Sequence, residues 1–420
     1  MILNEFKPIF RRRSKIKAKL KLTLLGKLAL VLMLLAVVSL TGCSGAARLG
    51  WAGTLVHEYT TQADGEDPVD HAVLFVGTME GELAAYDLLD ADRKRLWSQK
   101  VGDDAVLYGR PVASGEYVYI ASYTDADSVG GVLWKFNADA NAEAPDSVAL
   151  SSKVVGGVEV GLGKVYVGTE DGVLHALNAD TLVEEWKYPA GDTTLSDRIW
   201  GTPTLDIDEG VIYFGCFNNK FYALDAVTGE EKWDPFETGG AIGGKPLVYD
   251  GKVYFGSFDR KFYALDKATG KEAWTTPFTA GKWFWTEPIV YDDTIYVGCL
   301  DHKLYALDAA TGTKESEFTT DAPITSPPVA ATHYGANKVL GDDDDVDIII
   351  VASNKGSVFA LAPANLAAEA WNSYFPLGES IQSPMSVYGN LVYVYGSNST
   401  LTAAWLINGE PFAWEKSTAP

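Results

Sequence analysis

The feature that most constrains this chain is a repeat of roughly 45 residues, whose clearest copy spans residues 253–274. That copy, VYFGSFDRKFYALDKATGKEAW, contains two short runs rich in aromatic and β-branched residues, and turn-forming residues separate them. Each run is typical of a β-strand, and Thr269-Gly270 places glycine where a turn needs a positive φ. The first run has equivalents marked by Phe75, Tyr119, Tyr166, Tyr213, Tyr254, Tyr296, Ile350 and Tyr393.

Each copy contains the material for four strands. A leading strand comes first, usually after a proline, where no ladder hydrogen bond is lost. The copies close on Trp97, Trp186, Trp233, Trp274, Trp371 and Trp414. Four short strands in a fixed period are typical of a propeller blade, whereas a β-solenoid, the alternative, has shorter and more uniform repeats. The repeat predicts an all-β, eight-bladed β-propeller over residues 51–416, or seven blades if the degenerate second copy is not one.

The first 42 residues are predicted to be a targeting segment. A basic region precedes an apolar run at residues 28–40, which is shorter than the roughly 20 residues of a membrane span. This order is typical of a secretory signal peptide, and Leu40-Thr41-Gly42-Cys43 resembles a bacterial lipobox. We therefore expect a signal peptide at residues 1–42, a lipid on Cys43 and a short tether at residues 43–50. An uncleaved N-terminal anchor is the alternative.

Charge and cysteine content further restrict the functions that are possible for this chain. The formal net charge is −22, and removing residues 1–42, with nine basic residues and one acidic residue, gives −22 − 9 + 1 = −30. Such an acidic chain is not expected to bind nucleic acid. Cys216 and Cys299 occupy the same position two copies apart, too far for a disulfide, so both are expected to be small buried residues. The sequence predicts an exported monomer on the outer side of a bacterial membrane.

The pattern Tyr-Phe-Gly-Ser…Tyr-Ala-Leu-Asp…Thr-Gly…Trp resembles the pyrroloquinoline-quinone-type propeller repeat of quinoprotein dehydrogenases. The same repeat occurs in the outer-membrane assembly lipoprotein BamB, and the resemblance covers roughly residues 51–415. It implies that the closing tryptophans pack between neighbouring blades. Quinoprotein dehydrogenases hold their quinone between a tryptophan and a vicinal cysteine disulfide, beside a calcium ion. This chain has no adjacent cysteines, so we expect no cofactor.

No catalytic motif stands out, and the chain is predicted not to be an enzyme. Its five histidines are scattered, no Gly-x-Ser-x-Gly elbow occurs, and His175 takes the repeat's tyrosine position, which favours packing. No Cys/His cluster has metal-ligand spacing. One acidic run is a candidate calcium loop, but it lacks the alternating spacing and internal glycine of such loops, which favours an acidic hairpin tip. It consists of Asp342, Asp343, Asp344, Asp345 and Asp347.

The residues just before the leading strands differ between copies, and in a propeller they crowd one mouth of the central channel. A site on a symmetric scaffold should show such differences, although surface drift also produces them. The candidate binding residues are Tyr108, Arg110, Trp200, Lys245, Trp283, Trp285, Glu287 and Gln382. The first hypothesis is a membrane-tethered, non-enzymatic scaffold with a protein partner in envelope assembly. The alternative is a sugar or quinone binder, or a quinoprotein-like enzyme, that uses this mouth.

Overall fold

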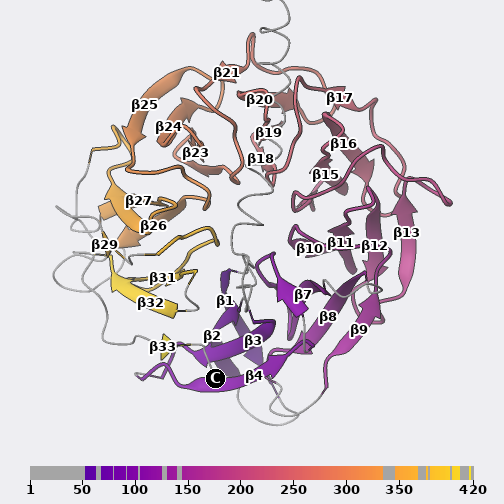
Figure 1. Ribbon diagram of the computed structural model, residues 1–420, viewed down its shortest axis with the longest axis vertical. Coiled ribbons are helices and arrows are strands. Elements are labelled where there is room, and N and C mark those ends of the chain that lie inside the picture. Colours follow the sequence, from indigo (N-terminus) through magenta and orange to yellow (C-terminus); the bar gives the residue numbers. More distant parts are fainter. Residues whose placement is uncertain are drawn as a thin grey trace, which may run out of the picture. The chain divides into compact units, whose positions relative to one another are not determined.

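The computed structural model shows a ring of small antiparallel sheets (Figure 1). The chain divides into two units, residues 1–49 and 50–420, and every described residue belongs to the second. The described residues are 53–62, 68–78, 80–90, 92–102, 105–124, 130–139, 144–333, 346–367, 375–376, 379–397, 400–406 and 416–417. The predicted signal peptide, the tether, Cys43 and Asp342 to Asp345 lie outside them.

Eight sheets follow one another along the chain, and we number them as blades 1–8. Blade 1 contains β1 (Thr54–Thr61), β2 (Val69–Gly77), β3 (Glu82–Asp87) and β4 (Arg95–Lys100). Blade 2 contains β5 (Ala105–Leu107), β6 (Val112–Ser114), β7 (Tyr117–Thr124), β8 (Gly131–Asn137) and β9 (Asp146–Ala149). Blade 3 contains β10 (Val158–Gly161), β11 (Lys164–Gly168), β12 (Leu174–Asn178) and β13 (Glu184–Tyr188). Blade 4 contains β14 (Thr204–Asp206), β15 (Val211–Gly215), β16 (Lys220–Asp225) and β17 (Phe236–Glu237).

The second half of the ring repeats this arrangement. Blade 5 contains β18 (Leu247–Tyr249), β19 (Lys252–Gly256), β20 (Lys261–Asp266) and β21 (Phe278–Thr279). Blade 6 contains β22 (Ile289–Tyr291), β23 (Thr294–Gly298), β24 (Lys303–Asp308) and β25 (Lys314–Thr319). Blade 7 contains β26 (Val329–His333), β27 (Val346–Ala352), β28 (Ser357–Leu361) and β29 (Phe375–Pro376). Blade 8 contains β30 (Ser386–Tyr388), β31 (Leu391–Tyr395), β32 (Thr400–Trp405) and β33 (Lys416–Ser417). The predicted eight-bladed β-propeller is confirmed.

Two blade details differ from the predicted pattern. In blade 2 the leading strand is split, because β5 and β6 both pair with β7 on either side of residues 108–111. In blades 4 and 5 the closing tryptophan lies outside the short last strand. Pro235 and Pro277 follow these tryptophans, and proline cannot donate a ladder hydrogen bond. The outer strand there is reduced to β17 and β21, each of two residues.

The strands of each blade run as a simple antiparallel meander, which fixes two faces of the disc. The loops that lead into each first strand, here called entry loops, lie at the same strand ends as the turns between second and third strands. We call this side the mouth face. The turns after first and third strands lie at the other strand ends, on the opposite face. Loop residues far apart in sequence therefore meet on one face.

The hydrophobic core is divided among the boundaries between blades. The middle strands are buried on both sides, which explains their nearly continuous apolar runs: Val253 and Phe255 pack with blade 4, whereas Tyr254 packs with blade 6. Each of the eight boundaries holds its own cluster of buried apolar residues. Burial at each boundary supplies about 25 cal/mol per Å² of apolar surface.

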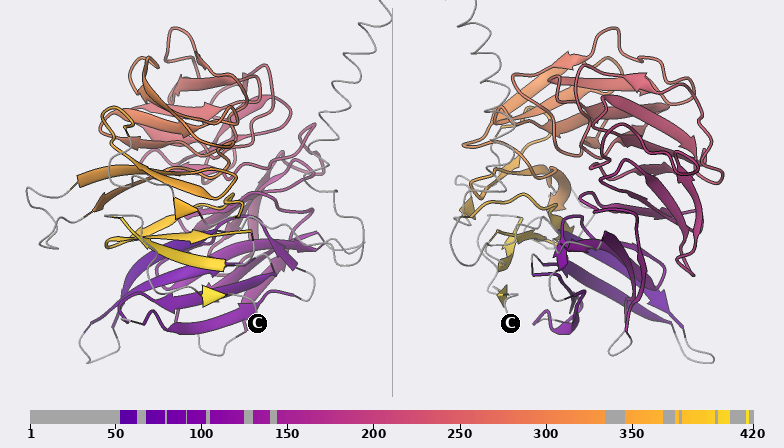
Figure 2. Two further views of the ribbon diagram at one scale, coloured as in Figure 1. Left: turned by 60° about the vertical axis from the view of Figure 1, so that its left-hand side comes forward. Right: turned by 45° about the vertical axis from the view of Figure 1, so that its right-hand side comes forward.

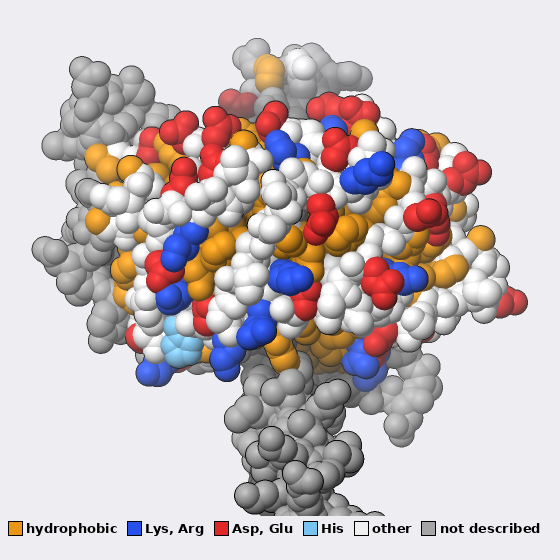
Figure 3. All heavy atoms as spheres, turned by 90° about the horizontal axis from the view of Figure 1, so that it is seen from above, with side chains coloured by type: hydrophobic (Ala, Val, Ile, Leu, Met, Phe, Trp, Pro, Cys, Tyr) orange, Lys and Arg blue, Asp and Glu red, His pale blue; other side chains and the backbone are white. Residues whose placement is uncertain are grey.

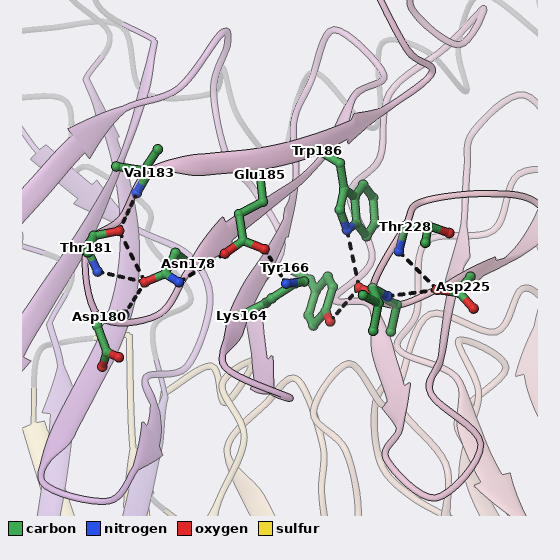
Figure 4. A network of polar contacts seen from close by, with 12 residues as sticks. Lys164, Tyr166, Asn178, Asp180, Thr181, Val183, Glu185, Trp186, Asp225 and Thr228 are labelled. Carbon is green, nitrogen blue, oxygen red and sulfur yellow. Dashed lines mark hydrogen bonds and ion pairs between the residues drawn. The ribbon is translucent and has the colours of Figure 1, made fainter.

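A repeated aromatic contact joins consecutive blades. At the boundary of blades 3 and 4, the hydroxyl of Tyr166 and the indole N–H of Trp186 both donate to the carbonyl of Ala226, at 2.9 and 3.2 Å (Figure 4). The same pair recurs one blade pair later, where Tyr213 and Trp233 both donate to the carbonyl of Lys267. We call this arrangement the aromatic clamp. The predicted packing of tryptophans between blades is confirmed for Trp97, Trp186, Trp233 and Trp274, whereas Trp371 and Trp414 lie outside the described residues.

The ring closes between its first and last blades. The amide of Thr54 donates to the carbonyl of Pro384 at 3.4 Å, and its hydroxyl donates to Ser386 at 2.9 Å. One core cluster contains residues of both blades, including Leu74 and Tyr393. The left view of Figure 2 shows β31 and β32 beside the strands of blade 1. The ring therefore closes through non-covalent contacts between blades 1 and 8.

In the part of the chain that the structure describes, no helix is long and apolar enough to cross a membrane.

Candidate functional site at the mouth face

The entry loops share one local design. Arg198-Ile199-Trp200 and residues 283–285 each place a fully buried apolar residue between two half-buried ones. The buried Phe284 packs against Gly256, where an added Cβ would lie 2.2 Å from the Cβ of Phe284. Only glycine leaves room for this close approach. The buried residue thus anchors the loop, and the flanking side chains remain at the mouth face.

Backbone hydrogen bonds tie each entry loop to the adjacent turn on the mouth face. The amide of Phe217 donates to the carbonyl of Arg198 at 3.0 Å, and that of Phe258 donates to Ala241 at 2.8 Å. The residue two positions after the strand-ending glycine is therefore held beside the entry loop of its own blade. Its side chain adds to the set that the entry loops supply.

These loops bring together five aromatic residues from blades 4, 5 and 6, which we call the aromatic cluster. The ring of Phe258 stacks on Trp283 with centroids 5.0 Å apart and on Trp285 at 5.5 Å. Trp200 contacts Phe217 at 4.7 Å and Trp285 at 6.4 Å, in both cases edge to face. Such pairs each contribute about 0.5–1.5 kcal/mol beyond the burial of their area. All five side chains remain half-buried at the mouth face.

Arg198 extends this cluster with a cation. Its guanidinium lies 4.9 Å from the Trp200 ring centroid and 5.7 Å from that of Phe217. It also pairs with Asp197 at 3.1 Å and Glu170 at 3.8 Å. The indole nitrogen of Trp200 is buried and has no hydrogen-bond partner among the described residues. Aromatic rings beside an arginine are the residue types that dominate binding energy at protein interfaces.

A second group, the axial ion chain, joins blades on opposite sides of the ring. Arg110, which lies between β5 and β6 of blade 2, is 4.0 Å from Glu287, which leads into blade 6. Glu287 lies 3.9 Å from Lys245, and Lys245 pairs with Glu159 of β10 at 3.0 Å. Blades 2 and 6 face each other across the ring, so these side chains span its axis. Lys245 and Glu159 are only 15% and 18% exposed.

The structure separates the predicted candidates into groups. Trp200, Trp283 and Trp285 join the aromatic cluster, whereas Arg110, Lys245 and Glu287 pair among themselves and with Glu159. Tyr108 stacks on Tyr123 with centroids 5.3 Å apart, within blade 2. The side-chain amide of Gln382 donates to Asn354 at 3.1 Å, between blades 7 and 8. The eight predicted residues therefore form several clusters.

Sequence reasoning missed Phe217, Phe258, Arg198 and Glu159. A signal for the two phenylalanines was present, because both stand two residues after the glycine that ends a second strand. Equivalent positions in blades 3 and 7 hold Glu170 and Asn354. The position varies between copies, as the entry-loop residues do, but the fold was needed to place the two sets side by side.

Of the candidate calcium residues, Asp347 lies among the described residues. One carboxylate oxygen accepts a hydrogen bond from Thr332 at 2.6 Å, and the other accepts one from the hydroxyl of Tyr291. This carboxylate raises the pKa of Tyr291 to about 12. Asp347 thus links blades 6 and 7. Among the described residues, no three His, Cys, Asp or Glu side chains are placed to hold a metal ion.

Both described cysteines are free and buried, as predicted. The thiol of Cys216 donates to the carbonyl of Asp197 at 3.2 Å, and that of Cys299 donates to Trp283 at 3.3 Å. Burial raises the pKa of Cys216 to about 11 and that of Cys299 to about 12. Both thiols therefore stay protonated at neutral pH and act as packing groups that hold entry loops.

Comparisons with known proteins agree with this architecture. The profile of the family described as "Outer membrane protein assembly factor BamB" matches residues 124–243 and 235–418. The chain belongs to this family. The crystal structure of BamB from Moraxella catarrhalis superposes with a TM-score of 0.59 at 18% identity, over 83% of this chain and 99% of that one. The resemblance to BamB that the repeat predicted is confirmed.

Two relatives point in different functional directions. The quinoprotein ethanol dehydrogenase of Pseudomonas putida is 31% identical over 175 residues, which are 38% of this chain and 26% of that enzyme. BamB of Nitrosomonas eutropha is 25% identical over 169 residues, 39% of this chain and 37% of that protein. The chain thus matches about a quarter to a third of the length of these relatives. It is a quinone-type-repeat propeller similar both to BamB and to quinoprotein dehydrogenases.

The residues present do not fit the quinone site that the second resemblance implies. That site uses two adjacent cysteines, whereas the chain holds Cys43, Cys216 and Cys299. Cys216 and Cys299 lie on blades 4 and 6, where each donates to an entry-loop carbonyl. The cysteines of the propeller therefore hold loops.

Proposed function

We propose that this protein is a membrane-tethered β-propeller whose principal role, as an interaction scaffold in envelope protein assembly, is non-enzymatic. The family match supports this role, since the family is described as an outer membrane protein assembly factor. The lipobox-like Leu40-Thr41-Gly42-Cys43 supports a lipid anchor on the outer side of a bacterial membrane. The observation that carries the proposal is the aromatic cluster at the mouth face.

The cluster has the composition of a protein-binding centre. Packing residues repeat from blade to blade, whereas Trp200 and Trp285 are matched in blades 7 and 8 by Thr325 and Gln382. Trp283 is likewise matched there by Pro323 and Ser380. Large aromatic side chains and arginine supply most of the binding energy in protein interfaces, usually from the centre of the patch. A partner that covers the cluster would bury the exposed parts of five aromatic rings and Arg198.

Charge also distinguishes the two faces. Figure 3 shows one side of the ring from above, the side that carries β17, β20, β21 and β25. Carboxylates gather along one edge of this view, and Lys and Arg gather along the other edge. Exposed carboxylates on turns of the opposite face include Glu209, Asp250, Asp292 and Asp293. Exposed cations at the mouth-face ends of the strands include Arg260, Lys261 and Lys282. A partner at the mouth face therefore meets less like-charge repulsion if it is acidic, as this chain is.

The test is affinity capture from detergent-solubilised membranes of the native host after chemical crosslinking, with the full chain as bait. We expect a stable partner from the outer-membrane assembly machinery with the wild type and loss of most of it with the double variant Phe258→Ala and Trp285→Ala. Val227→Ala is the matched control, because Val227 is a 58% exposed apolar residue on the opposite face. It should leave capture unchanged.

Two outcomes would contradict the proposal. One is that crosslinked membranes yield no stable partner with the wild-type bait. The other is that the mouth-face double variant and Val227→Ala reduce capture equally, which would indicate a general loss of folding or a different contact face. Thermal unfolding of each bait separates these two causes.

A small-ligand function is the second candidate, favoured by the aromatic rings that lie at the mouth face with the amide groups of Gln382 and Asn354. Sugars stack on such rings and bind amides. A ligand of this kind should quench tryptophan fluorescence in the wild type and not in Trp285→Ala. If neither sugars nor quinones nor short peptides change the fluorescence, this candidate fails and the scaffold proposal is unaffected.

A further inference from the structure

At the boundary of blades 2 and 3, away from the aromatic cluster, three side chains form a hydrogen-bonded chain. The hydroxyl oxygen of Ser151 lies 3.0 Å from Nε2 of His175. Nδ1 of the same ring lies 2.6 Å from a carboxylate oxygen of Glu184. A hydroxyl, an imidazole and a carboxylate in this order are the groups that activate a serine nucleophile.

The fold explains why these residues meet. Ser151 follows β9 in the loop that leaves blade 2, and His175 is the second residue of β12. Glu184 begins β13 opposite Leu177, which points to the same side of β12 as His175. Blades 4, 5 and 6 carry tyrosine at the His175 position, as Tyr222, Tyr263 and Tyr305. The histidine is therefore a departure from the repeat at one blade boundary.

Hydrogen bonding indicates which nitrogen carries the proton. An ionised Glu184 can only accept, so Nδ1–H donates to it, and the lone pair of Nε2 faces Ser151. Thr169 also lies 3.4 Å from Nε2, but its hydroxyl is close to two other acceptors, Asp171 at 2.6 Å and the carbonyl of Val173 at 2.9 Å. Ser151 is thus the hydroxyl placed to donate to the imidazole.

The exposure of the imidazole and of the serine suits an activated nucleophile. The imidazole is 4% exposed and therefore fixed in its orientation, whereas Ser151 is exposed and within reach of a substrate.

We propose that Ser151 is an activated nucleophile that accepts an acyl group from an unhindered carboxylic ester. Its hydroxyl oxygen attacks the ester carbonyl carbon while its proton passes to Nε2 of His175. The carbon–oxygen bond to the alcohol then breaks, and the alcohol leaves with that proton, so the product is acyl-Ser151. Water hydrolyses this ester by the same route. Glu184 is a positioning residue that holds the imidazole.

The test uses p-nitrophenyl acetate as the probe and the full propeller chain as the protein. Release of p-nitrophenolate reports the acyl transfer, and peptide mass mapping locates the acetyl group. Ser147 is an internal control, because it is an exposed serine four residues away with no histidine partner among the described contacts. We expect acetylation of Ser151 and not of Ser147.

Variants then assign the roles. Ser151→Ala should abolish acetylation at that position. His175→Gln should lower the rate at Ser151 by about 10²-fold or more, the usual contribution of a general base. His175→Tyr restores the residue that blades 4 to 6 carry, so it keeps the fold and should lose the reaction. Glu184→Gln should slow acetylation at Ser151 while melting temperature and labelling of other residues stay unchanged.

The proposal is overturned if Ser151 and Ser147 are acetylated equally in the wild type, or if His175→Gln leaves the rate at Ser151 unchanged. The wild-type comparison of the two serines decides the matter even if a variant fails to fold. Ser151 lies in the entry loop of blade 3, apart from the aromatic cluster, and the opposite-face control Val227→Ala should leave its reaction intact.

Discussion

Neighbouring blades are joined differently at the boundary of blades 5 and 6 and at the boundary of blades 2 and 3. In the first, Tyr254 and Trp274 both donate to the carbonyl of Ala309, at 2.9 and 3.1 Å. In the second, Tyr119 makes the equivalent bond to Ala179 at 3.0 Å, and no tryptophan of the described chain donates to the same carbonyl. Both boundaries contain the hydrogen bond from a tyrosine hydroxyl, whereas only the aromatic clamp adds a hydrogen bond from an indole N–H.

The boundary of blades 2 and 3 uses polar groups in place of the indole. Lys135 is 7% exposed, donates to the carbonyl of Asp180 at 2.7 Å and lies 4.0 Å from the ring centroid of Tyr117. His175, which contacts Ser151 and Glu184, lies at the same boundary. A boundary that does not depend on one large aromatic side chain leaves room for other residue types, and the proposed nucleophile Ser151 lies there with His175.

The largest effect should come from ionising the buried tyrosine that each of the two boundaries contains, together with its equivalents at other boundaries. Burial raises the pKa of Tyr119 to about 12 and raises those of Tyr166, Tyr213 and Tyr254 well above the ordinary value of about 10. Above pH 10 the unfolded chain loses phenolic protons that the folded chain keeps, so stability falls as pH rises through the folded pKa. We expect cooperative unfolding between about pH 10 and 12.

Absorbance of the phenolate and tryptophan fluorescence, followed together against pH, check this prediction. The two signals should change in one transition. A titration in which these tyrosines ionise near pH 10 while the fluorescence stays native would contradict it.

The next largest effect is a loss in the free energy of unfolding that should differ between the two boundaries. Trp274 is 3% exposed and packs on Gly312, which has a positive φ and leaves no room for a Cβ beside the indole. Trp274→Ala removes this packing and one hydrogen bond, and we expect a loss of about 3–5 kcal/mol in the free energy of unfolding. The matched change at the polar boundary, Lys135→Met, removes one hydrogen bond but keeps most of the volume, so about 1 kcal/mol is expected.

Denaturant unfolding of the two variants beside the wild type provides the measurement. Equal losses would show that the boundary of blades 2 and 3 depends on its buried lysine as strongly as the aromatic clamp depends on tryptophan. The comparison between the boundaries would then be wrong.

The sequence predicted the fold well, because the repeat exposes the pattern of every blade. Phe262 and Tyr263 recur in other copies with little change, and such positions are dictated by packing on both faces of a middle strand. The site was predicted only in part. Trp283 and Trp285 were found because they differ from their counterparts, but their contact with Phe258 depends on a turn of the preceding blade. The chain from Ser151 through His175 to Glu184 crosses a blade boundary, which no local spacing reveals.

The smallest effect should come from the axial ion chain, which links opposite blades without either kind of boundary packing. Glu287 touches both Arg110 and Lys245, so Glu287→Gln removes the central charge of the chain. Both contacts are long and Glu287 is 23% exposed, so the loss should be at most about 1 kcal/mol and should shrink in 1 M salt, which screens charges beyond about 3 Å. Denaturant unfolding at low and high salt measures it. A loss comparable to that of Trp274→Ala would mean that contacts across the axis, rather than those between neighbouring blades, hold the ring together.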